Sequence, residues 1–347
     1  MTAIPLPYTD ACEHIPPDEP ADTEVALALT RQILRETHRR TREFRRMVHA
    51  KSNGWAVGTW AVLPHLPPEL AQGLFAVEAT YDVLTRFSNG ANAPQSDLVP
   101  DARGLAIKVF SRDAARAEVV AGLQDFIFNN QPTFFAADVK DFVRWERVLA
   151  SDGGLDTLRS AGDAFTAGSW NPFDWRWRDA AAVARLTVQP PQHPGRITYF
   201  SQSPFRYGNY VAKFRVQPTG EVSTTTLAAV ETFASDPNAL RSLLQESLRR
   251  EPLHFEFQVQ LRTSASSMPI EDATVEWPES ESPYRSVALL TLPPQEVGAS
   301  VSREVTEQTA FNIWNTLPAH RPLGGINRLR RAAYAISAEW RRGATHE

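Results

Sequence analysis

The pattern of hydrophobic and polar positions predicts a series of strands with helices on either side. Mixed or alternating apolar segments predict strands at residues 55–63, 81–85, 197–201, 209–216, 254–262 and 286–292. Segments with helical spacing and good helix formers predict helices at 22–46, 136–150, 237–250 and 327–342. Antiparallel strands followed by helices are typical of an α+β domain built on a β-barrel.

Three other segments do not follow these periodicities. Residues 1–21 contain five prolines and are expected to form an extended arm, and residues 264–285 are expected to form a long connection. Between Trp170 and Trp177 the chain is rich in aromatic residues before an Ala-rich helix. We interpret these aromatic residues as part of the core or of a lid, because no basic groove pattern accompanies them.

Composition narrows the class of protein. The 347 residues are 42% hydrophobic, which allows one large core in a single domain over residues 1–347. The net charge of -4 argues against a general nucleic-acid-binding protein, and Cys12, the only cysteine, allows no intramolecular disulfide. No apolar run approaches the length of a membrane span, and the start of the chain does not resemble a secretory signal. We therefore expect a soluble, cytoplasmic protein.

The last predicted helix carries the first candidate chemistry. Arg330, Tyr334 and Arg341 are spaced i, i+4 and i+11, so they lie on one helix face. A permanent positive charge close to a phenol favours the phenolate, and Tyr is one of the few side chains that ligate haem iron. A basic surface helix with one half-buried Tyr has the same pattern, so both interpretations stay open at this point.

Five segments in a fixed order resemble motifs of one protein family. RMVHAKSNG at 46–54 resembles the distal-histidine motif R-x-V-H-A-K-x-x-G of haem catalases, and RFSN at 86–89 is a second match. DARGLAIKVF at 101–110 is similar to the family's D-x-R-G-x-A-x-K-x-F strand, and NNQPTFF at 129–135 to its N-N-x-P-x-F-F segment. RRAAY at 330–334 is similar to the proximal motif.

The chain thus resembles the catalase superfamily, and most closely its short branch of minimal catalase-related haem peroxidases. The resemblance implies an antiparallel β-barrel with surrounding helices and a proximal Tyr on a C-terminal helix. It also implies a single haem-binding domain with haem b as cofactor. The implied enzyme is a peroxidase or catalase that cleaves hydrogen peroxide or an organic hydroperoxide heterolytically through a ferryl intermediate.

The resemblance assigns roles to individual residues. Tyr334 would be the iron ligand, with Arg330 holding it as phenolate. His49 would transfer the peroxide proton, and Asn129 would align the far oxygen. Ser88 would orient the imidazole. Further residues would bind haem or border its access channel: Arg46, Arg86 and Arg341 at the propionates, Phe134 against the haem and Val48 at the channel.

Some positions depart from the family pattern. Phe128, before the distal Asn, replaces a small residue and is expected to narrow or reshape the pocket. Ser52, Asn53 and Trp55 replace small apolar residues, and Ala338 replaces a basic one. These changes argue against a high catalase turnover, and the electron donor is expected to be an organic reductant or a second hydrogen peroxide.

Two other functions remain as alternatives. One is an allene oxide synthase-like isomerase acting on a lipid hydroperoxide, which Val48 disfavours because that branch has a hydroxyl-bearing residue there. The other is a haem carrier or basic-helix binding protein, which His49 and Asn129 disfavour. The sequence leaves the oligomeric state open, a homo-oligomer included.

Overall fold

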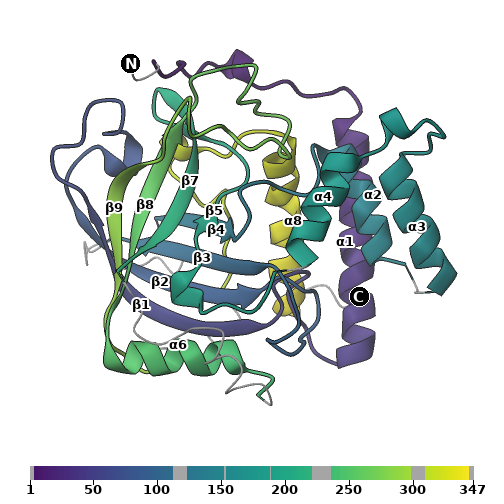
Figure 1. The fold of residues 1–347 in the computed structure, drawn as a ribbon, viewed down its shortest axis with the longest axis horizontal. Helices are drawn as coiled ribbons and strands as arrows, with labels where there is room; N and C mark the ends of the chain where they lie inside the picture. The colour runs from purple at the N-terminus through teal and green to yellow at the C-terminus, as the bar shows by residue number, and fades with distance from the viewer. Residues whose placement is uncertain are drawn as a thin grey trace.

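The centre of the fold is an antiparallel β-barrel (Figure 1). The computed structural model describes residues 4–111, 123–151, 154–187, 189–220, 236–297 and 309–343. The strand order is β5-β4-β3-β2-β1-β9-β8-β7-β6, and pairing of β5 with β7 closes a ring of eight strands that leaves β6 outside it. The strands are β1 (Ser52–Val62), β2 (Thr80–Asn89), β3 (Arg103–Phe110), β4 (Gln124–Asn129), β5 (Tyr199–Phe200), β6 (Phe205–Tyr207), β7 (Tyr210–Thr219), β8 (Leu253–Leu261) and β9 (Arg285–Leu292).

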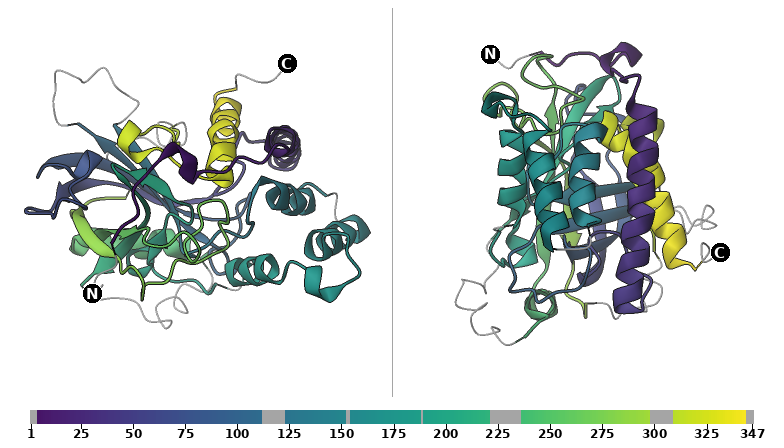
Figure 2. Two further views of the ribbon diagram at one scale, coloured as in Figure 1. Left: turned by 90° about the horizontal axis from the view of Figure 1, so that it is seen from above. Right: turned by 90° about the vertical axis from the view of Figure 1, so that its right-hand side faces the viewer.

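Helices cover one side and one end of this barrel. In Figure 2, α8 and α1 lie side by side next to the barrel with α2, α3 and α4 beyond them, and in Figure 1 α6 lies at one end. The α-helices are α1 (Glu19–Thr41), α2 (Val139–Leu149), α3 (Gly154–Thr166), α4 (Trp177–Thr187), α6 (Ala239–Arg250) and α8 (Gly325–Arg341). Short 3-10 helices span Asp10–Cys12, Gly73–Phe75, Pro172–Asp174, Pro194–Arg196 and Pro318–His320. The predicted α+β fold with the Tyr334 helix at its C-terminal end is confirmed.

Aromatic side chains fill the barrel. Phe257 is fully buried, and its ring centroid lies 4.4 Å from that of Trp60, 4.9 Å from that of Phe126 and 5.3 Å from that of Phe214. Aromatic side chains bury large areas, and tilted or edge-to-face pairs add stability beyond that burial. The alternation of side chains along each strand places this cluster inside and leaves the other face for the helices.

The first predicted helix was wrong at both ends. It begins at Glu19, because Pro20 is accepted in the first turn of a helix. It ends at Thr41, where Arg42 takes a left-handed conformation with φ 58° and donates its backbone N–H to His38 O. The strand predicted at 81–85 also continues to Asn89, so the RFSN motif lies within β2.

The prediction for the aromatic segment at 170–177 was wrong in part. Trp170 is 98% exposed and Phe173 is 95% exposed, so the interpretation of these two residues as core is wrong. The backbone around them is held locally, since Trp175 Nε1 donates to Ser169 O (2.9 Å) and Trp177 Nε1 donates to Pro172 O (2.9 Å). Among the described residues no helix is long and apolar enough to span a membrane.

The aromatic core allows a stability test. Because Phe257 is fully buried among rings, Phe257→Ala should lower the free energy of unfolding by about 3–5 kcal/mol. Urea denaturation would measure this change. As a control, Val77→Ala at a position that is 68% exposed should stay within about 0.5 kcal/mol of the wild type. Equal losses in both variants would contradict the placement of Phe257.

Candidate active site

Three of the motif segments meet in one row across the barrel wall. Ser88 of β2 pairs with Gly104 of β3, which pairs with Asn129 of β4. Directly opposite residues of antiparallel strands share a face, and neighbouring strands lie about 4.8 Å apart. Ser88 and Asn129 therefore flank Gly104 on the outer face of the barrel, although they are far apart in sequence.

The imidazole of His49 lies over the glycine of this row. His49 Nδ1 is 3.1 Å from Ser88 Oγ, and a Cβ atom on Gly104 would lie only 2.6 Å from the imidazole Nδ1 and Cε1. His49 has a φ of 56°, which non-glycine residues seldom adopt. Hydrogen bonds hold it there: its N–H donates to Gly90 O (3.0 Å), and Arg86 Nη2 donates to its carbonyl oxygen (2.8 Å).

The surroundings of His49 keep the imidazole neutral. Burial lowers the pKa of His49 to about 3, and the positive charges of Arg86, Arg330 and Arg46 lower it in the same direction. Since Nδ1 faces Ser88, the opposite nitrogen, Nε2, is the one available for proton transfer. The backbone of Asn89 also hydrogen-bonds the imidazole and opposes this lowering of its pKa.

Asn129 points to the same face with one polar atom unsatisfied. Its Oδ1 is buried and has no hydrogen-bond partner within the described residues. Buried polar atoms are nearly always satisfied, so this Oδ1 is available to a bound ligand or to water. The preceding residue, Phe128, is 2% exposed and packs inside the barrel against Phe126 and Phe257. The expectation that Phe128 narrows the pocket is therefore wrong, because alternation turns it to the opposite face.

Helix α8 brings Tyr334 to the barrel. Tyr334 is half-buried and packs against the main hydrophobic core, and its hydroxyl makes no hydrogen bond within the described part of the chain. Arg330, one turn earlier, does not bond Tyr334; its Nη1 donates to Asn327 Oδ1 (3.2 Å). The Arg330 guanidinium carbon lies 5.0 Å from the ring centroid of Phe134. Tyr334, Arg330 and Phe134 are thus brought into one neighbourhood.

The same helix contacts the segment that precedes His49. Ser337 Oγ accepts a hydrogen bond from the backbone N–H of Met47 (3.4 Å) and one from Arg341 Nη1 (3.3 Å). Val48, between Met47 and His49, is half-buried. The contact places the predicted proximal helix beside the predicted distal segment, with Tyr334 one turn before Ser337.

Two of the predicted propionate-binding arginines share one tryptophan. The guanidinium carbons of Arg46 and Arg86 lie 5.9 Å and 5.6 Å from the ring centroid of Trp55. Arg46 Nη2 also donates to Thr309 O (2.7 Å). Cation–π contacts of this kind stabilise guanidinium positions. The sequence analysis gave Trp55 no role beyond a departure from the family pattern. Trp55 lies in β1, two positions after Asn53.

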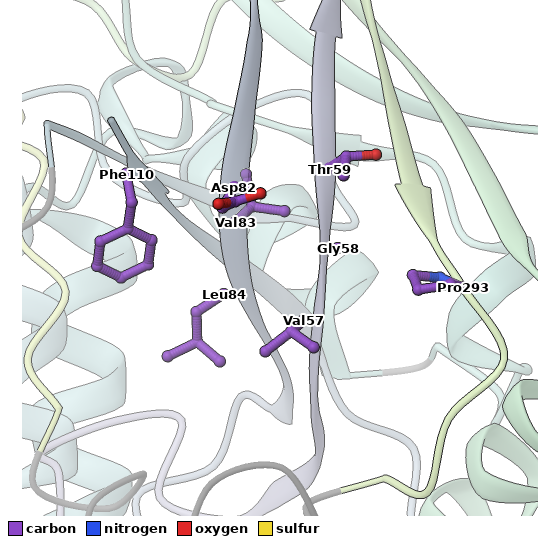
Figure 3. Close-up of a pocket in the computed structure, with 8 residues that line it drawn as sticks. All are labelled: Val57, Gly58, Thr59, Asp82, Val83, Leu84, Phe110 and Pro293. Atoms are coloured by element: carbon purple, nitrogen blue, oxygen red, sulfur yellow. The ribbon is translucent and has the colours of Figure 1, made fainter. Parts of the chain in front are cut away.

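An apolar hollow of about 460 Å³ lies elsewhere on the barrel wall (Figure 3). It lies over β1 and β2, and its lining offers no histidine and no guanidinium. It is therefore not where the sequence motifs converge. The lining residues are Val57, Gly58, Thr59, Asp82, Val83, Leu84, Phe110 and Pro293.

Comparisons with known proteins agree with the fold and with the motifs between residues 46 and 135. The catalase family model matches residues 24–153, which include His49, Ser88, Gly104 and Asn129. Similar solved structures are catalase A from Saccharomyces cerevisiae (19% identity, TM-score 0.66, covering 87% of this chain and 62% of that one) and a bacterial catalase (19%, 0.66, 99% and 64%). A fungal catalase is also similar (18%, 0.65, 88% and 60%). No curated protein matches the sequence.

These findings agree with the predicted fold and with the predicted resemblance. The chain has the fold of the similar catalase structures, and the catalase family model matches residues 24–153, in line with the predicted resemblance to the catalase superfamily. The chain spans less than two thirds of the length of each of these catalases.

The close approach of His49 to Gly104 gives a second test. Gly104→Ala should push the imidazole away from Ser88 and cost about 1–3 kcal/mol of folding free energy, because the new methyl group has no room. NMR of the histidine ring nitrogens and urea denaturation would measure both effects. Gly162→Ala in α3, where no atom lies within 4 Å of the added Cβ, should instead be stabilising by about 0.5–1 kcal/mol. An unchanged His49 signal in Gly104→Ala would refute the proposed contact.

Proposed function

We propose that the protein is a haem-b peroxidase from the short branch of the catalase superfamily. The observation that supports this most strongly is His49, which is held over Gly104 by Ser88 beside the unsatisfied Oδ1 of Asn129. A protein that only carries haem has no need for a neutral proton acceptor beside an unsatisfied amide. The fold and the catalase family model support the same class.

The residues present fit a haem group. Tyr334 has a hydroxyl without a partner in the described chain, and it would be the iron ligand. Arg330 would supply positive charge near it, and Phe134 would pack against the macrocycle. The three arginines at 46, 86 and 341 would bind the two propionates, since a guanidinium donates two parallel hydrogen bonds to a carboxylate. Haem would supply the redox chemistry for heterolytic cleavage of the peroxide O–O bond.

The chain's own residues would move one proton. His49 Nε2 would accept the proton of the peroxide oxygen nearer the iron and return it to the far oxygen, which leaves as water or as an alcohol. Ser88 would keep Nδ1 directed away from the peroxide, so that Nε2 faces it. The Asn129 amide would hydrogen-bond the peroxide and align it.

The substrate would be hydrogen peroxide or an organic hydroperoxide, with an organic reductant as electron donor. We place this activity in a single domain over residues 1–347 of a cytoplasmic protein. Steady-state assays with guaiacol-type donors, and with hydrogen peroxide alone, would test it. Oxygen release as the main reaction would indicate a catalase instead, and a rearranged lipid hydroperoxide formed without any donor would indicate the isomerase.

The iron ligand can be tested by spectroscopy. After reconstitution with haem, the wild type should show a ferric spectrum with charge-transfer features of phenolate ligation. Tyr334→Phe should lose these features and bind haem more weakly. Tyr81→Phe, which changes a partly buried tyrosine of β2, is the control and should keep the wild-type spectrum. A wild type that binds no haem, or a Tyr334→Phe variant with the wild-type spectrum, would refute the assignment.

The pH dependence follows from His49. With its pKa lowered to about 3, the imidazole stays neutral above pH 4. Its function as a base is lost only as the pH falls through this pKa. We expect kcat/KM for hydrogen peroxide to change less than about twofold between pH 8 and pH 5. A histidine with the usual pKa of about 6.5 would reduce it about 30-fold at pH 5. Stopped-flow rates, with circular dichroism at each pH to verify folding, would decide.

A further inference from the structure

A second pocket opens beside the distal segment. Its volume is about 360 Å³, and it is formed by residues just before His49, residues just after it and the N-terminal end of α6. Ala50, which follows His49 directly, lines it, and consecutive Cα atoms are about 3.8 Å apart. The lining residues are Glu43, Phe44, Arg45, Ala50, Lys51, Ser52, Pro94, Asn238 and Arg241.

Positive charge prevails in this lining. Arg45, Lys51 and Arg241 face one acidic lining residue, Glu43. Lys51 is fully engaged, because its Nζ donates to Gln95 O (2.8 Å) and to Pro237 O and pairs with Asp97 Oδ1 (2.7 Å). Since Arg45 pairs with Glu43, Arg241 is the lining cation without an ion pair among the described residues.

The two arginines differ in the donors that they keep for a ligand. Arg45 pairs with Glu43, and its Nε, which has no hydrogen-bond partner among the described residues, is buried. Arg241 uses only Nη2, which donates to Ser52 O (2.9 Å), so most of its five N–H donors remain within the described part of the chain. The exposed Asn238 at the start of α6 makes no capping hydrogen bond with its side chain.

We propose that this pocket binds the carboxylate of an organic substrate and thereby holds that substrate beside His49. The planar guanidinium fork matches a carboxylate, whereas neutral hydrogen peroxide gains nothing from two arginines. The proposal rests on the proposed peroxidase function and specifies its substrate class. The carboxylate belongs either to an organic hydroperoxide or to the reducing donor.

Paired substrates that differ only in charge test the pocket. One arm compares linoleic acid hydroperoxide with its methyl ester, and the other compares 3-(4-hydroxyphenyl)propionate with its methyl ester as donor to hydrogen peroxide. The arm that responds shows whether the carboxylate belongs to the hydroperoxide or to the donor. In that arm, Arg241→Gln and Arg45→Gln should each lower the ratio of kcat/KM for the acid to kcat/KM for the ester at least tenfold, about the loss of one charged hydrogen bond. Glu43→Gln should raise the ratio, because it removes the opposing charge.

A matched control and a binding measurement separate this proposal from the proposed function. Arg250→Gln removes the same charge from α6 at a residue that pairs with Glu246 outside the pocket, and it should leave both ratios unchanged. Unchanged ratios in Arg241→Gln and Arg45→Gln in both arms would overturn the proposal. If the wild type has no peroxidase activity, calorimetry with 3-phenylpropionate decides: binding that Arg241→Gln weakens supports the pocket, and no binding by the wild type overturns it.

Discussion

The position of helix α8, and with it that of Tyr334, depends on one arginine. Arg328 bonds both carboxylate oxygens of Glu19 (2.6 Å and 2.7 Å), Glu13 through Nη1 (2.7 Å) and Glu271 through Nη2 (2.8 Å). These carboxylates come from the N-terminal arm, from the first residue of α1 and from the connection before β9. Bidentate guanidinium–carboxylate pairs fix geometry as well as charge, so the three segments and the helix are held together.

The same carboxylates also complete the start of the helix. Gly324 N–H donates to Glu13 Oε1 (2.9 Å), and Gly325 N–H donates to Glu271 Oε2 (2.9 Å). The first N–H groups of a helix lack internal partners, and negative charge is stabilising there. At 1.5 Å per residue, Tyr334 lies about 9 Å along the axis from Arg328. The arm that the sequence predicts only as extended thus helps to set the depth of the candidate iron ligand.

The sequence predicts the barrel and the convergence of motifs better than it predicts local boundaries. The three motifs that contain His49, Ser88 and Asn129 lie together in the structure, because antiparallel pairing brings distant segments into one row. The direction of Phe128 could have been read from alternation once the strand was known, yet comparison with family positions suggested the pocket instead.

Other features depend on contacts that no single segment records. The left-handed Arg42 ends α1 without a glycine, and the exposure of Trp170 follows from a local turn and not from its hydrophobicity. The partners of Arg328 come from positions 13, 19 and 271, a separation that sequence periodicity cannot detect. The family motifs cover residues of the candidate site. They do not include the residues that hold α8 in place, so the motifs could not predict those residues.

The charges and the burial around His49 favour the release of a proton by the imidazole over its uptake. Burial and the charges of Arg86, Arg330 and Arg46 make the imidazolium costly, which makes His49 a weak base. By the same reasoning, an imidazolium with a pKa of about 3 is a strong acid and readily gives its proton to a leaving oxygen. Arg330 contributes to this low pKa of His49. Its partner among the described residues is the neutral amide of Asn327, so no carboxylate there offsets its charge. The arrangement therefore suits a reaction in which protonation of the leaving oxygen is the demanding step.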